Sequence, residues 1–176
     1  MGADKALLDF GGHTLLERAI AVMRETSPNF AIVGDAAKFA AYGAVIADLY
    51  PGCGPLAGIH AALMHSSAEL NLMLAVDMPF VTRELIAFLF AAASETDAIV
   101  VVPRTARGFQ PLCAVYRRAF ASTAEAALRA GNYKIDGVFP KVTIRAVEEE
   151  ELARAGISER IFFNVNTPED LRTAKK

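Results

Sequence analysis

The sequence predicts an α/β fold in which a mostly parallel sheet carries helices on both faces. Apolar runs of strand length alternate along the chain with amphipathic segments of helix length. Several of these strand-length runs are apolar at every position, which is typical of strands covered by helices on both sides. The 176 residues contain neither a long linker nor an internal repeat, so we expect one domain over residues 1–176.

The first half of the chain supplies three expected helices and three expected strands. Thr14 and Glu17 fit a capping box, and apolar side chains follow at helical spacing as far as Pro28. Pro55 suits a first helical turn, where its missing N–H needs no partner. The expected strands are residues 30–33, 44–47 and 71–76, and the expected helices begin at Thr14 and cover residues 36–41 and 56–65.

The second half of the chain continues the alternation of expected strands and helices. Thr82 is positioned to cap one helix, Gly131 and Gly156 to end two others, and Thr167 with Asp170 to cap the last. A polar loop is expected over residues 104–110. The expected strands are residues 98–102, 112–116, 142–147 and 162–165, and the expected helices cover residues 82–94, 118–130 and 148–155 and begin again at Thr167.

Composition excludes several classes of protein. With 53% hydrophobic residues the chain is not intrinsically disordered. The 18 basic and 20 acidic residues provide no strongly basic surface, so no nucleic-acid partner is expected. No apolar run is long enough to cross a membrane, no signal peptide is recognisable, and two cysteines fit free thiols in a reducing compartment. We therefore expect a cytoplasmic protein without a membrane partner.

Candidate functional residues follow the expected strands, because ligands of open α/β sheets bind beyond the carboxyl ends of the strands. Asp77 comes directly after an apolar strand and suits Mg²⁺, which takes one or two protein carboxylates together with phosphate oxygens. Capping of the turn at Met78 and Pro79 explains Asp77 equally well. Asp48 also ends a strand and could contact a nucleotide, although a solvated loop carboxylate is the simpler interpretation.

Three further features carry both a structural and a functional interpretation. The glycine-rich residues 52–58 lead into a helix and allow close approach of an anion, but such turns are common. Lys5 could neutralise a phosphate, or be a solvated charge near the terminus. Asn164 and Asn166 could read a heterocycle through their amides, although local turn and cap bonding is their commoner use.

Taken together, four motifs resemble the molybdenum cofactor guanylyltransferases, known as the MobA family. They occur in the family's order at plausible spacing over nearly the whole chain. The motifs are residues 2–8 (GADKALL), 54–58 (GPLAG), 76–80 (VDMPF) and 164–170 (NVNTPED). The family pattern begins further upstream, with a strand and a glycine-rich loop, so we expect a hole in the sheet where that inner strand lies in the family.

The resemblance implies a Rossmann-like nucleotidyltransferase fold and Mg²⁺-dependent transfer of GMP from GTP to molybdopterin, with release of pyrophosphate. It implies GTP and molybdopterin as partners, and a molybdoenzyme or its chaperone as acceptor of the finished cofactor. By position in the chain, Lys5 and Asp77 match the family's catalytic residues. Lys5, Asp48 and Asp77 match family residues at the nucleotide site, and Asp77 matches the residue that binds the metal. Gly2, Asn164 and Asn166 match family residues that bind the molybdopterin substrate.

The chemistry of the residues agrees with this resemblance. Transfer between phosphates needs positioning and charge neutralisation more than a covalent nucleophile, and the sequence shows no nucleophile elbow or zinc spacing. Three alternatives remain open. They are another nucleotidyltransferase, of the molybdopterin cytidylyl or sugar-phosphate type, an inactive nucleotide-binding remnant, and a phosphoacceptor receiver suggested weakly by Asp77.

Overall fold

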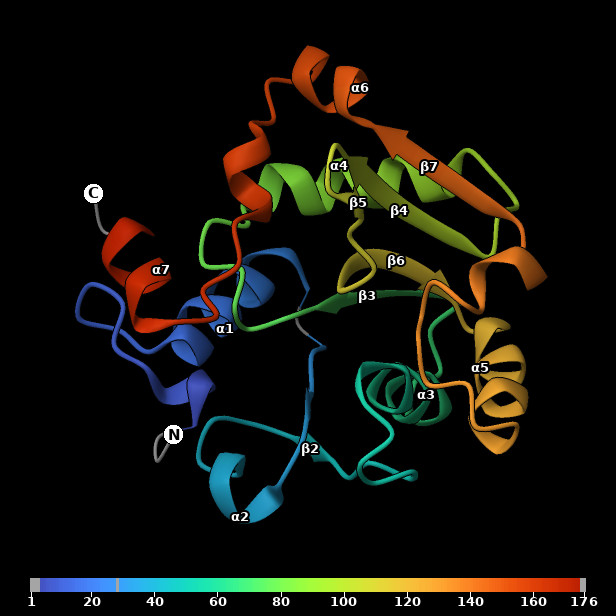
Figure 1. The fold of residues 1–176 in the computed structure, drawn as a ribbon, viewed down its shortest axis with the longest axis horizontal. Helices are drawn as coiled ribbons and strands as arrows, with labels where there is room; N and C mark the ends of the chain where they lie inside the picture. Colours follow the sequence, from blue (N-terminus) through green and yellow to red (C-terminus); the bar gives the residue numbers. More distant parts are fainter. Residues whose placement is uncertain (1–3, 28, 175–176) are drawn as a thin grey trace.

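Two separate sheets organise the chain in the computed structural model, which describes residues 4–27 and 29–174 (Figure 1). The strands are β1 (Ile32–Val33), β2 (Val45–Ile46), β3 (Leu70–Leu74), β4 (Val100–Thr105), β5 (Gly108–Phe109), β6 (Cys113–Arg117) and β7 (Ile144–Glu148). The α-helices are α1 (Leu15–Thr26), α2 (Ala36–Phe39), α3 (Pro55–His65), α4 (Arg83–Ser94), α5 (Phe120–Arg129), α6 (Glu149–Arg154) and α7 (Pro168–Ala174). Short 3-10 turns cover Lys5–Leu7, Phe139–Lys141 and Glu159–Phe162.

The expectation of a mostly parallel sheet is wrong. The five-stranded sheet has the order β3-β6-β4-β5, with β7 on the other side of β4. Only the β4–β7 pair is parallel in that sheet, whereas β6 runs antiparallel to both β3 and β4, and β5 runs antiparallel to β4. The smaller sheet consists of β1 and β2, which are parallel.

The short connection between β4 and β6 explains the antiparallel pairing. Parallel neighbours need a crossover of about a dozen residues or more, and only residues 106–112 separate these two strands. Most of that segment, expected as a polar loop, is instead a hairpin in which Arg104 and Thr105 pair with Phe109 and Gly108. Because β3 and β4 both oppose β6, they run parallel to each other with α4 between them in sequence, so the α/β character is retained.

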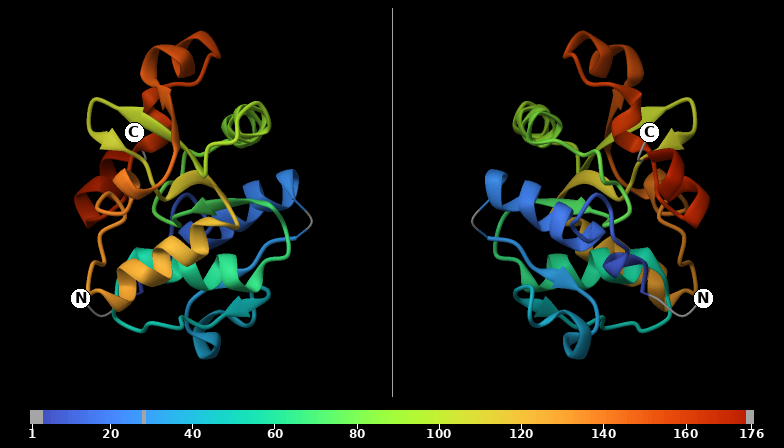
Figure 2. Two further views of the ribbon diagram at one scale, coloured as in Figure 1. Left: turned by 90° about the vertical axis from the view of Figure 1, so that its right-hand side faces the viewer. Right: turned by 90° about the vertical axis from the view of Figure 1, so that its left-hand side faces the viewer.

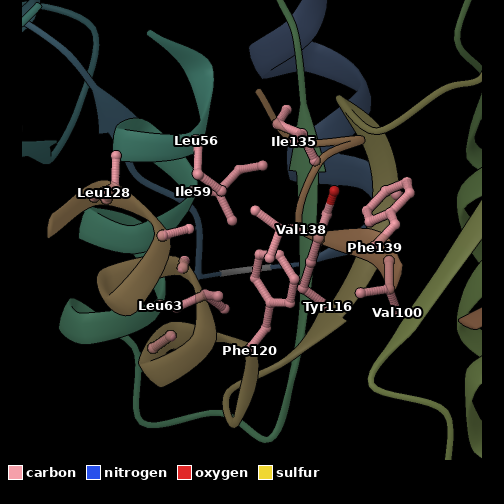
Figure 3. Packing of buried hydrophobic residues seen from close by; sticks show 14 of the residues in the cluster. Leu56, Ile59, Leu63, Val100, Tyr116, Phe120, Leu128, Ile135, Val138 and Phe139 are labelled. Carbon is pink, nitrogen blue, oxygen red and sulfur yellow. The ribbon is translucent and has the colours of Figure 1, made fainter. Parts of the chain in front are cut away.

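Helices cover both faces of the central sheet, as the sequence predicted (Figure 2). Alternate residues of β4 point to opposite sides: Val100 and Val102 pack with α3 and α5, whereas Val101 packs with α4. Figure 3 shows the first of these cores, where Tyr116 and Phe120 meet the apolar face of α3. The central sheet is therefore packed between two hydrophobic cores.

Helix starts are the best-predicted local features. Thr14 and Glu17 form the expected capping box, the Thr82 hydroxyl accepts from the N–H of Leu85, and Pro55 occupies the first turn of α3. The strand expected over residues 162–165 is absent: Phe162 ends a 3-10 turn, and residues 163–165 belong to no strand of the described chain. Within the described residues, no helix is long and apolar enough to span a membrane.

The C-terminal segment returns to the start of the chain, and this return builds the candidate site. Phe10 and Leu15 pack with Val165 and Ala174 in one buried cluster. Figure 1 accordingly shows α7 beside the N-terminal segment, at the end of the molecule that β3 runs toward. Residues 5 and 166 are thereby brought together although 161 positions separate them in the sequence.

Candidate functional site

Three of the predicted residues meet at the edge of the sheet where β3 ends. Lys5 Nζ donates to Asp77 Oδ2 at 2.6 Å and to Asn166 Oδ1 at 2.6 Å. We call Lys5, Asp77 and Asn166 the rim cluster. It joins a turn near the N-terminus, the segment after β3 and a residue two positions before α7, so its geometry depends on contacts between distant parts of the chain.

Local backbone structure fixes each member of the rim cluster. Lys5 opens a 3-10 turn whose cap, Asp4, accepts from the N–H of Ala6 at 3.2 Å. Asp77 follows β3, and its carbonyl oxygen accepts from the N–H of Val165 at 2.8 Å. This backbone bond holds the strand-end loop against the segment that carries Asn166, so the sheet and the last helix share one rim.

Hydrogen bonds stabilise the ionised carboxylates of Asp4 and Asp170, which lie beside the rim cluster. A hydrogen bond from Lys38, with a smaller contribution from the N–H of Ala6, lowers the pKa of Asp4. Hydrogen bonds with Thr167 and with the N–H of Asn166 lower the pKa of Asp170. Both carboxylates are therefore ionised at neutral pH, and each remains an acceptor for the backbone next to a member of the rim cluster.

The carboxylate of the rim cluster fits a hard cation that takes most of its other ligands from a bound phosphate group. The side chain of Asp77 is 21% exposed, and its Oδ1 is buried without a hydrogen-bond partner among the described residues. A buried carboxylate oxygen without a partner is costly, and Mg²⁺ is a suitable partner because it binds through one or two carboxylates and phosphate oxygens. No group of three His, Cys, Asp or Glu side chains in the described residues forms a complete protein-only metal site.

The structure leaves the other candidates outside these contacts. Asp48 Oδ1 accepts from the N–H of Tyr50 at 2.8 Å, a turn that caps the loop before α3. Asn164 lies two residues before Asn166 in sequence but has no hydrogen bond to the rim cluster among the described residues. Gly2 lies outside the described residues. Asp170 was singled out only as a helix cap, and its contacts with residues 166 and 167 place it beside the cluster.

Two sizeable cavities lie elsewhere. One, of about 450 Å³, lies between α1 and the start of α4 and is lined by His13, Arg18 and Glu84 among others. The other, of about 420 Å³, lies between α3 and α5. Neither is lined by the rim cluster. The rim cluster is therefore a candidate site because of its charges and hydrogen bonds, and not because it lines one of these two cavities.

Comparisons with known proteins identify the chain as a nucleotidyltransferase. Residues 1–142 match the family described as MobA-like NTP transferase domain. The chain is 37% identical over 177 residues to a protein of Pelotomaculum thermopropionicum described as a probable molybdenum cofactor guanylyltransferase. That alignment covers 99% of this chain and 85% of the relative.

Solved structures agree with this assignment. The crystal structure of molybdopterin-guanine dinucleotide biosynthesis protein A from Archaeoglobus fulgidus has a TM-score of 0.86 and 30% identity, covering 99% of this chain and 90% of that one. A 2-C-methyl-D-erythritol 4-phosphate cytidylyltransferase from Thermus thermophilus has a TM-score of 0.72 at 22% identity, covering 97% and 92%, and shares the fold. The chain belongs to the MobA-like NTP transferase family.

Proposed function

We propose that the protein transfers GMP from GTP to the terminal phosphate of molybdopterin. A phosphate oxygen of the pterin attacks the α-phosphorus of GTP, the bond from that phosphorus to the bridging oxygen breaks, and pyrophosphate leaves. The observation that carries this proposal is the rim cluster, a lysine and a carboxylate 2.6 Å apart at the end of β3 in a chain of this family. Both reactants are anionic, so positioning and charge neutralisation lower the barrier most.

Lys5 is proposed to neutralise charge on the departing pyrophosphate. Its ammonium group carries three N–H donors, and the contacts with Asp77 and Asn166 occupy two of them. The side chain is 34% exposed, so the third donor can reach a nucleotide phosphate from the solvent side. Asn166 and Asp77 hold the ammonium at the rim before the nucleotide arrives, which reduces the entropy lost on binding.

Asp77 is proposed to hold Mg²⁺, with Asp48 toward the nucleotide and Gly2, Asn164 and Asn166 toward the pterin. When bound, the ion would supply charge stabilisation on phosphate oxygens. The unpartnered Oδ1 of Asp77 supports this assignment. The finished cofactor would pass to a molybdoenzyme or its chaperone. The free thiols of Cys53 and Cys113 are in keeping with action in the reducing cytoplasm.

A nucleotide competition assay tests the proposal. The full chain is incubated with molybdopterin, Mg²⁺ and equal GTP and CTP, and the dinucleotide products are separated. We expect the guanine product and one pyrophosphate per product. Preference for CTP would overturn the guanylyl assignment in favour of a cytidylyltransferase. Calorimetric titration with each nucleotide accompanies the assay, because nucleotide binding without transfer would identify an inactive nucleotide-binding remnant.

A further inference from the structure

We infer that Asp170 is a positioning residue, which orients Asn166 and through it the ammonium group of Lys5. Asp170 Oδ2 accepts from the backbone N–H of Asn166 at 2.9 Å and from that of Thr167 at 2.8 Å. The N–H of Asp170 donates in return to Thr167 Oγ1 at 3.0 Å. Its relevance to catalysis rests on the proposed function, in which Lys5 contacts the nucleotide.

These bonds form a continuous chain from α7 to the end of β3. Two N–H groups converge on one carboxylate oxygen and fix the backbone at residues 166 and 167. The Asn166 side chain starts from that backbone and accepts from Lys5 Nζ, which also donates to Asp77. A change in the backbone direction at residue 166 therefore moves the acceptor that holds Lys5.

Packing alone does not orient Asn166, which makes the bonds to Asp170 necessary. Val165, one residue earlier, is 0% exposed and is anchored by its N–H bond to the carbonyl oxygen of Asp77. Asn166 itself is exposed, so its direction is set by hydrogen bonds. The helix that follows spans only Pro168–Ala174, a length that is unstable without a cap and tertiary packing.

Glu169 provides a matched control within the same helical turn. It is also acidic and lies in the first turn of α7, so its charge interacts with the helix dipole much as that of Asp170 does. It is exposed, and its side chain makes no hydrogen bond with the described residues. An effect of Asp170→Ala that Glu169→Ala does not reproduce is due to the bonds at residues 166 and 167.

The first experiment uses the full chain without nucleotide, so its result is independent of the proposed function. Amide hydrogen exchange and side-chain amide resonances of Asn166 are followed by NMR in both variants. We expect Asp170→Ala to speed exchange at residues 166 and 167 at least tenfold and to shift the Asn166 side-chain resonances, and Glu169→Ala to leave them in place. Unchanged Asn166 resonances in a folded Asp170→Ala protein would overturn the inference.

The second experiment is a double-mutant cycle on GMP transfer. We expect Asp170→Ala to lower kcat/KM about tenfold. Adding it to Asn166→Ala should cause no further loss, because both changes act through one chain of contacts. Additive losses would overturn the inference. Asp170→Asn keeps an acceptor oxygen for the two N–H groups and should retain more of the rate than Asp170→Ala. Thr167→Val, which removes the hydroxyl that accepts from the N–H of Asp170, should lower the rate and serves the same cycle if the alanine variant unfolds. Thr167→Ser keeps this hydroxyl and should retain the rate.

Discussion

Replacement of Asp77 by Asn separates the catalytic role of its charge from its structural role. The variant keeps the size of the side chain and the backbone bond from Val165 to the carbonyl oxygen of residue 77. Losing the metal-binding charge removes several kcal/mol of transition-state stabilisation, and about 4 kcal/mol corresponds to about a 10³-fold fall in kcat. We therefore expect turnover with GTP and Mg²⁺ to fall about 10³-fold.

The same substitution should change stability little. The Lys5 and Asp77 side chains are 34% and 21% exposed, and an ion pair this accessible contributes about 1 kcal/mol or less. The unpartnered Oδ1 of Asp77 offsets part of that contribution. Urea unfolding should accordingly give a free energy of unfolding within about 1 kcal/mol of the unmodified chain.

Pyrophosphate release provides the assay, and Asp97→Asn provides the control. Asp97 is exposed and precedes β4, so it lies at the opposite edge of the sheet from Asp77. It undergoes the same change of charge, and its variant should retain full turnover. Near-normal turnover in Asp77→Asn would refute the assignment of the charge to catalysis. A large loss of stability in that variant would refute the argument from exposure.

Three further outcomes are expected. Lys5→Met should lower turnover about 10²-fold, measured by pyrophosphate release, and unchanged turnover would exclude a role for its charge on the leaving group. Thr14→Ala breaks the capping box with Glu17 and should lower the free energy of unfolding by about 1 kcal/mol in urea, whereas no change would mean that packing alone holds α1. Burial raises the pKa of the Cys113 thiol to about 12, so at pH 8 a thiol reagent should modify only Cys53 in the folded chain. Rapid modification of both thiols would contradict the buried placement of Cys113.

Sequence patterns within one helical turn correctly predicted where several helices begin. The capping box at Thr14, the cap at Thr82 and the proline at the start of α3 are all present. The direction of β6 was mispredicted because period and apolarity do not distinguish parallel from antiparallel strands. The short connection after β4 carried the missing information, since it cannot contain a crossover.

The sequence predicted which residues belong to the candidate site better than it predicted how they are arranged. The motifs singled out Lys5, Asp77 and Asn166, which the structure joins by two hydrogen bonds. Their proximity depends on the packing of Val165 near the N-terminal segment, a long-range contact that no local pattern encodes. For Asp48 the simpler structural interpretation agrees with its bond to the N–H of Tyr50, and a nucleotide role remains a proposal.

A crystal structure of the full chain with GTP and Mg²⁺ tests the central claim most directly. The account predicts the triphosphate at the rim cluster, with a phosphate oxygen within hydrogen-bond distance of Lys5 Nζ and the metal bound by the carboxylate of Asp77. A triphosphate seated elsewhere, for example in the cavity between α1 and α4, with the Lys5–Asp77 pair untouched, would contradict it.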